Sequence, residues 1–531
     1  MYFIYPLLLV CALDLFGSTR AALSAYAPIP ATCPSTPLVR TASGLSESES
    51  AYIAARSPIA SAALGKWLQK VNSTFSTANL PIVALTTSGG GLRSLLIGAG
   101  VIQAFDARDS NTGLSGLYQG LTYQAGLSGG GWLLSSIAGN NYPTISSLQT
   151  NLWTTAFQET LLVPANLAVG PAYGQITADV EAKNAAGFPP TIVDVYGRLL
   201  SYQLLYGPDG GVAIELSSIT GFSNFTSHAV PYPIITALDV ETSTGACIPP
   251  NNSVIYEFSP YEFGSFDAGV NAFTQTRYLG TSLSNGVPTK PTCETNYDNL
   301  GYILGTSSDI FNEFCASSPN VPQGPGTVFA NATAIINNIH ALTTRDEYAI
   351  YPNPFYNYAH STLVSSQTTL TLADGGESNQ NNPLFPLLQP SRKVGVIIVN
   401  DNSADTSDNF PNGSELHQTY LQSLSAGLKK MPVIPPTITN THPTFFGCND
   451  ASKITIVYLP NYNYTYPSGQ STFKPEYSAA ETNGMIMNGG QVATDGGNQG
   501  FPLCLACAVA KKTGGVLPAG CAACFATFCY N

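Results

Sequence analysis

Two short apolar runs in the first third of the chain each end in a cluster of glycines, and each precedes a helix-like stretch. Residues 81–87 read PIVALTT, stop at Ser88–Gly91 and lead into the apolar residues 92–105. The same pattern recurs over residues 120–138, where glycines recur within 126–131. Short β-rich apolar runs predict buried strands. Two strand–turn–helix units in succession predict an α/β fold with parallel strands.

The remaining hydrophobic pattern predicts the outline of the fold. A run of Thr and Leu at 368–372 and an apolar run at 394–400 predict two further core strands, and residues 46–73 form a helical pattern. Residues 25–45 are rich in Pro, Ser and Thr and predict an extended arm, while residues 150–350 lack clear periodicity. We expect a layered α/β/α hydrolase-like core with a central mixed, mostly parallel sheet, plus an irregular cap from residues 150–350.

Composition excludes several functional classes. The chain has 531 residues, of which 44% are hydrophobic and only 10% charged, against about 25% charged in soluble domains. Its 20 Lys and Arg oppose 32 Asp and Glu, a net charge of −12. Such a chain is a poor partner for a phosphate backbone, so no nucleic-acid partner is expected. The high apolar fraction excludes a disordered chain.

The first 22 residues have the features of a secretory signal peptide. An apolar run over residues 1–13 is interrupted by Asp14 and is followed by small residues at 17–22. This apolar run is too short to span a bilayer. A buried N-terminal helix is the alternative. No later segment has 18 consecutive apolar residues and no GPI-type tail is evident, so we expect a secreted, extracellular protein without a transmembrane segment.

The cysteines and glycosylation sequons agree with export. Removal of Cys11 with the signal leaves ten of the 11 cysteines, and an even number in an exported chain predicts disulfides. The spacing within the Cys-rich segment 500–531 also fits a zinc ribbon, and this alternative stays open at this point. Six Asn-x-Ser/Thr sequons are candidate glycosylation sites, namely Asn72, Asn224, Asn251, Asn331, Asn412 and Asn463.

Ser128 has the sequence context of a catalytic nucleophile. It lies in Gly-Leu-Ser-Gly-Gly at a predicted strand-to-helix turn, where small neighbours let a hydroxyl occupy a strained, exposed elbow. The helix N-terminus then directs its N–H groups at the reacting oxygen. The glycines of Ser88–Gly91 leave amides free for an oxyanion or a phosphate. No P-loop lysine follows them, and Arg93 in the next turn is suited to bind phosphate.

A general base is predicted at Asp374. The carboxylate ends an apolar strand and precedes Gly375–Gly376, and a buried carboxylate can accept a Ser proton directly in a Ser–Asp dyad. None of the five histidines, His228, His340, His360, His417 and His442, has a Gly-rich or strand-end context. The residues alone do not exclude a His-containing triad.

Three sequence blocks together resemble the fungal lysophospholipase/phospholipase B family, which shares its catalytic module with cytosolic phospholipase A2. They are TSGGGLRS at 87–94, GLSGGGW at 126–132 and ADGGESNQNNPLFP at 373–386. Residues 396–405 and the arm at 26–34 are also similar. The resemblance runs from about residue 26 to the C-terminus, and we expect residues 26–531 to form a single catalytic domain.

The resemblance implies roles and a substrate. It makes Ser128 the nucleophile, Asp374 the base, Gly90 and Gly91 the oxyanion-hole amides, and Arg93 the ligand of the substrate phosphate. It implies a carboxylic ester hydrolase that needs no cofactor, metal or calcium for its chemistry. The substrate would be a lysophospholipid or phospholipid at a micelle or membrane surface. Alternatives are a broader lipase or acyltransferase, a non-catalytic secreted lipid-binding protein, and a zinc-ribbon interaction protein.

Overall fold

The computed structural model describes residues 24–158, 170–240, 245–312, 326–341, 343, 345–439 and 441–530. The side chains of residues 326–332 are not described. The predicted signal peptide and Cys315 lie outside the described residues.

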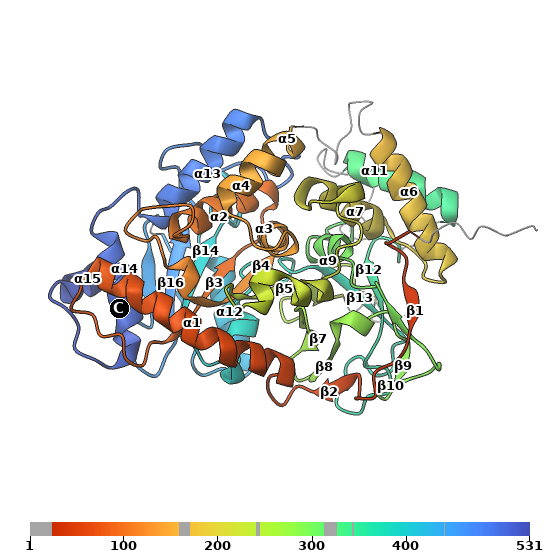
Figure 1. Cartoon of the computed structure of the whole chain (residues 1–531), viewed down its shortest axis with the longest axis horizontal. Coiled ribbons are helices and arrows are strands. Elements are labelled where there is room, and N and C mark those ends of the chain that lie inside the picture. The colour runs from red at the N-terminus through yellow and green to blue at the C-terminus, as the bar shows by residue number, and fades with distance from the viewer. Residues whose placement is uncertain are drawn as a thin grey trace, which may run out of the picture.

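A 12-stranded mixed sheet forms the core of the fold (Figure 1). Its main path runs through β15 (Thr444–Phe446), β16 (Thr455–Pro460), β14 (Val394–Asp401), β3 (Ile82–Thr87), β4 (Leu121–Leu127), β5 (Tyr232–Asp239), β6 (Ile255–Phe258), β7 (Glu262–Ser265), β8 (Ala272–Gln275) and β2 (Val39–Thr41). Off this path, β13 (Thr369–Asp374) pairs with β5 and with β12 (Ala349–Pro352).

The centre of the sheet is parallel and its flanks are antiparallel. Strands β16, β14, β3, β4 and β5 pair in parallel, and almost all of their residues are buried, as is usual for parallel strands covered on both faces. Strands β6, β7 and β8 continue the sheet antiparallel from β5. The predicted α/β class with a central mixed sheet is confirmed. The expectation that the sheet is mostly parallel is wrong, because four of its described strand pairings are parallel and seven are antiparallel. Part of the 150–350 region therefore lies inside the sheet, because β5 to β8 come from it.

Helices pack on the sheet in two groups. The first joins α2 (Gly91–Phe105), α3 (Gly129–Gly139) and α13 (Ala479–Ala493), which contact β14, β3 and β16. The second joins α1 (Glu47–Val71) to α14 (Phe501–Ala510), which contact β4 and β16. Figure 1 shows α1 running below the strands, away from α13 at the top. α1 begins at Ser46, whose side chain accepts the Glu49 amide and so satisfies one unpaired donor of the first turn.

A separate helical cluster covers the end of the sheet where β12 and β13 lie (Figure 1). α7 (Ile192–Leu204) packs against α9 (Leu300–Ser307), α6 (Gly170–Ala185) and α11 (Gly326–Ile339), and α9 also contacts α3, β5 and β13. The other described α-helices are α4 (Ile145–Leu148), α5 (Thr154–Ala156), α8 (Ser223–Thr226), α12 (Ser414–Ser425) and α15 (Cys521–Phe528).

Disulfides hold the arm and the C-terminal segment. In the arm, β1 (Ile29–Ala31) pairs with β11 (Cys293–Thr295), and Cys33 is bonded to Cys293. A separate small hairpin pairs β9 (Leu283–Ser284) with β10 (Val287–Pro288). The other described pairs are Cys448–Cys529, Cys504–Cys524 and Cys507–Cys521, and Cys247 is disulfide-bonded as well. These bonds consume the four thiols that a zinc ribbon would need, so that alternative is wrong.

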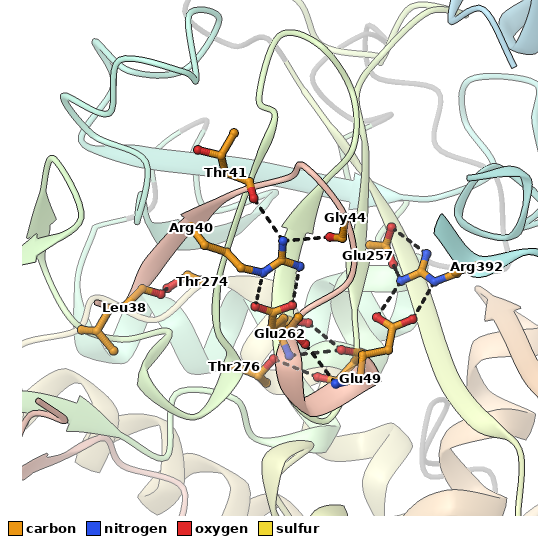
Figure 2. A network of polar contacts seen from close by, with 12 residues as sticks. Leu38, Arg40, Thr41, Gly44, Glu49, Glu257, Glu262, Thr274, Thr276 and Arg392 are labelled. Atoms are coloured by element: carbon orange, nitrogen blue, oxygen red, sulfur yellow. Dashed lines mark hydrogen bonds and ion pairs between the residues drawn. The ribbon is translucent and has the colours of Figure 1, made fainter. Parts of the chain in front are cut away.

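A buried ionic cluster ties α1 to the antiparallel half of the sheet (Figure 2). Arg392 precedes β14 and its side chain is 1% exposed. Its guanidinium donates to both carboxylate oxygens of Glu49 on α1, at 2.8 and 3.1 Å, and pairs with Glu257 on β6 at 2.6 and 3.2 Å. It also donates to the Pro386 carbonyl at 2.9 Å. The single positive charge of Arg392 thus opposes two buried carboxylates, Glu49 and Glu257. The same side chain joins three segments that are distant in sequence.

Candidate active site

Ser128 occupies a strained turn between β4 and α3. Its backbone has φ 49° and ψ −122°, a conformation that a non-glycine residue adopts only where the surroundings impose it. The glycines on either side make the turn possible, because a Cβ on Gly126 would overlap the Gly130 carbonyl and one on Gly130 would overlap the Thr87 carbonyl. The hydroxyl therefore lies at the N-terminus of α3, where the helix presents free N–H groups.

Asp374 ends β13 at the same level of the sheet as Ser128, with β5 between them. Asp374 is opposite Ala237 of β5, and Leu127, the residue before the serine, is opposite Thr236. The chain after Asp374 reaches the serine loop, because a Cβ on Gly375 would lie 2.7 Å from Leu127 Cγ. Asp374 is 7% exposed, and its Oδ1 accepts the Gly376 amide at 2.7 Å.

Ser307, at the end of α9, links the serine and aspartate loops. The Ser128 amide donates to Ser307 Oγ at 3.0 Å, and Ser307 Oγ donates to the Thr236 carbonyl at 2.7 Å. The Gly375 amide also donates to the Ser307 carbonyl at 3.4 Å. Ser307 was not among the predicted site residues, because it lies in the region without periodicity and no motif marks it.

The loop Ser88–Gly91 lies directly against Ser128. A Cβ on Gly89 would come 3.0 Å from Ser128 Cβ, and one on Gly129 would overlap the Gly91 carbonyl. Gly90 and Gly91 have φ of 134° and 59°, values that favour glycine. Among the residues that the structure describes, neither the Gly90 nor the Gly91 amide has a hydrogen-bond acceptor. Both are therefore available to an oxygen placed at the serine.

Arg93, in the first turn of α2, is completely buried next to Gly90. Its Nε donates to the Asn402 carbonyl at 3.0 Å and its Nη1 to the Gln470 carbonyl at 2.6 Å. Its Nη2 has no partner among the described residues and lies close to Gly90. Burial lowers the pKa of Arg93 to about 10, against the opposing effect of nearby acidic groups, so it stays cationic at neutral pH. Nε and Nη1 of the guanidinium are thus bonded to backbone carbonyls, and Nη2 is left to bind an anion.

Buried carboxyls lie near both the aspartate and the arginine. The Asp309 carbonyl accepts the Asp374 amide at 2.8 Å, and burial raises the pKa of Asp309 well above its usual value. Near Arg93, burial and then the charge of Asp401 raise the pKa of Asp405 to about 6. Burial and then the charge of Asp405 raise the pKa of Glu415 well above its usual value.

Each of the five histidines contacts a residue other than Ser128 through its ring. Those partners are Tyr52 for His228, Pro190 for His340, Tyr358 for His360, Ile434 for His417 and Asp495 for His442. Among the described residues, no group of three or more His, Cys, Asp or Glu side chains is placed to hold a metal ion.

The candidate glycosylation sites are spread over the surface. Asn251 and Asn463 are exposed, and Asn72, Asn224 and Asn412 are half-buried. The side chain of Asn331 lies outside the described residues. In the part of the chain that the structure describes, no helix is both long and apolar enough to cross a membrane.

A family model described as the lysophospholipase catalytic domain matches residues 83–531. The chain belongs to this family. Among curated relatives of this lysophospholipase family, Lysophospholipase 2 of Aspergillus fumigatus is 37% identical over 95% of this chain and 93% of its own length. Lysophospholipase 1 of Saccharomyces cerevisiae is 37% identical over 96% of this chain and 84% of its own. These matches confirm the predicted family and enzyme class, a lysophospholipase, against the non-catalytic alternative.

Solved structures show the same fold. Human GIVD cytosolic phospholipase A2 matches with a TM-score of 0.68 over 92% of this chain and 72% of its own, at 18% sequence identity. The likeness confirms the layered α/β fold class.

Proposed function

We propose that this lysophospholipase is a secreted serine esterase that removes fatty acyl chains from lysophospholipids, and both chains from phospholipids, through a Ser128–Asp374 dyad. The observation that carries the proposal is the strained Ser128 elbow, with two unpaired amides of the glycine loop against it and Asp374 one strand away. A nucleophile, a base and an oxyanion site are the groups that acyl transfer requires.

The reaction proceeds in two halves. Asp374 accepts the Ser128 proton as Oγ attacks the ester carbonyl, and the Gly90 and Gly91 amides bind the oxyanion that forms. Collapse of this intermediate releases the glycerol-containing alcohol, which takes the proton from Asp374, and leaves an acyl-enzyme on Ser128. Water then loses a proton to Asp374 and attacks the acyl ester. Collapse of the second intermediate releases the fatty acid while Asp374 returns the proton to Ser128 Oγ, which restores both groups.

Arg93 binds the phosphate of the headgroup in this proposal. Its unpaired, buried Nη2 supports the role, because a buried cationic N–H without an acceptor is costly unless a ligand supplies one. The two nitrogens bound to backbone carbonyls hold the guanidinium next to the glycine loop. Phosphate and oxyanion would then be bound side by side, which suits a phospholipid ester.

Export supports a substrate outside the cell, at a micelle or membrane surface. The disulfides of the described chain are typical of secreted proteins. Glycans on the predicted sequons would solvate a surface that carries few charges. The chemistry proposed uses only side chains and amides of the chain, with no cofactor and no calcium.

The test measures fatty-acid release from lysophosphatidylcholine. Ser128→Ala and Asp374→Asn should each reduce kcat by 100-fold or more, on the order seen for catalytic groups. Ser135→Ala is the matched control, because this buried serine lies on the same helix α3 and outside the machinery. A solved complex of human GIVD cytosolic phospholipase A2 contains methyl γ-linolenyl fluorophosphonate, and this probe should label wild type but not Ser128→Ala. Wild-type rates in Ser128→Ala would end the assignment.

A further inference from the structure

The side chain of Asn381 lies against Gly89, the first glycine of the loop. The Gly89 amide donates to both the carbonyl and Oδ1 of Asn381, each at 3.1 Å. In return, Asn381 Nδ2 donates to the Gly89 carbonyl at 3.3 Å. Gly89 is thus held at both its N–H and its C=O. Its amide is already occupied, which leaves the Gly90 and Gly91 amides as the unpaired donors of the loop.

The bond to the Gly89 carbonyl also sets the direction of the Gly90 amide. Both groups belong to one peptide unit, and no peptide in the described residues is cis. In a trans peptide the C=O and the following N–H point in opposite directions. The Gly89 carbonyl is bound by Asn381 on one side and approached by Ser88 Oγ at 3.2 Å. The Gly90 N–H therefore points away from Asn381.

The orientation of the Asn381 amide is itself fixed by a chain of hydrogen bonds to the sheet. Asn381 Nδ2 donates to Ser403 Oγ at 2.8 Å, and Ser403 Oγ donates to Asp401 at the end of β14. Tyr458 of β16 donates to the other oxygen of that carboxylate at 2.9 Å. Since Ser403 has one hydroxyl proton and gives it to Asp401, its oxygen can only accept from Asn381. A flipped amide would lose this bond.

We propose that Asn381 is a positioning residue for the oxyanion hole: it locks the Gly89–Gly90 peptide so that the Gly90 amide is presented, unpaired, to the developing oxyanion. The inference rests on the proposed function of Ser128 and the glycine loop. Asn381 touches no reacting atom and acts through the peptide that it holds. It should therefore affect the transition state, where the oxyanion forms, more than binding of the neutral ester.

The test compares Asn381→Ala and Asn381→Asp in steady-state hydrolysis of lysophosphatidylcholine. The aspartate has the same shape but places an acceptor against the Gly89 carbonyl. Both variants should lower kcat about 10- to 100-fold, somewhat less than loss of an oxyanion donor itself, with KM almost unchanged. Gln380→Ala is the control, because Gln380 lies on the same loop and its amide bonds to the Asn251 carbonyl instead. This control should keep the wild-type kcat.

The outcomes separate this inference from the function on which it rests. A wild-type kcat in Asn381→Asp, or an effect confined to KM, would overturn the role of Asn381 while an inactive Ser128→Ala upheld the nucleophile. Full activity in Ser128→Ala would instead refute the proposed function. If neither Asn381 variant folds, Ser403→Ala decides, because it frees the amide to flip. A lowered kcat there supports the proposal and an unchanged kcat overturns it.

Discussion

Replacement of Arg392 by methionine should destabilise the fold more than most single substitutions. The change leaves Glu49 and Glu257, whose side chains are each 4% exposed, without their cation. Removal of one partner from a buried ion pair costs about 3–5 kcal/mol, since an uncompensated charge stays buried. Two carboxylates depend on this one guanidinium, so we expect the upper end, about 5 kcal/mol.

The loss should depend on pH. Burial raises the pKa of Glu257, and Arg392 is the main group that lowers it again. Without the arginine, the pKa of Glu257 rises further above that of the unfolded chain, which is about 4.3. Folding then takes up a proton, so the stability of the variant falls as pH rises from the unfolded to the folded pKa. The deficit relative to wild type should be largest at neutral pH and smaller near pH 4.

Urea unfolding followed by tryptophan fluorescence at pH 4 and pH 7 measures both effects. The double variant Arg392→Met with Glu257→Gln removes one of the stranded charges and should recover part of the lost free energy of unfolding. Lys511→Met, a surface cation outside this cluster, is the control. A loss below about 1 kcal/mol, the range of exposed ion pairs, or the same loss at both pH values without rescue, would refute the reasoning.

Three further predictions follow from the site and its surroundings. Gly130→Ala should abolish activity, because the added Cβ would overlap the Thr87 carbonyl. The control Gly174→Ala, where nothing lies within 4 Å, should keep the wild-type kcat, with a free energy of unfolding unchanged or raised by about 0.5–1 kcal/mol as for other helix glycines. Equal kcat values in the two variants would contradict this prediction. Arg93→Lys should slow hydrolysis of lysophosphatidylcholine far more than that of a neutral triglyceride, and equal losses on both would point to a purely structural role. Glu415→Gln should raise the melting temperature at pH 7 but not near pH 4, because the raised pKa of Glu415 makes the wild type lose stability as pH rises. An equal rise of the melting temperature at both pH values would contradict this electrostatic origin.

The local parts of the site were predictable from the sequence. Strand, glycine turn and helix follow one another around Ser128 and around Ser88–Gly91, so a short window contains the elbow and the amides. The central strands β3, β4 and β14 were predictable for a related reason, because burial on both faces leaves them without charged residues except for Asp401 at the end of β14. The resemblance of three blocks then gave the family and the enzyme class.

The strands β5 to β8 were not predictable as parts of the sheet. Strands β6 to β8 are short and antiparallel, whereas β5 is longer and pairs in parallel with β4. All four come from a region rich in Tyr, Pro and Gly in which no hydrophobic period is visible. The cysteine pairing was likewise open, because Cys33 and Cys293 are 260 residues apart and meet only when β1 pairs with β11.

The sequence by itself determined the candidate residues for the proposed chemistry, namely a serine in a glycine elbow, a carboxylate at a strand end, and a glycine loop followed by arginine. Only the tertiary structure decided how they meet: β5 separates Ser128 from Asp374, Ser307 binds both loops, and Asn381 occupies the Gly89 amide. The physical reason is distance along the chain. Backbone conformation depends on neighbouring residues, whereas hydrogen bonds between segments hundreds of residues apart depend on how the whole sheet pairs.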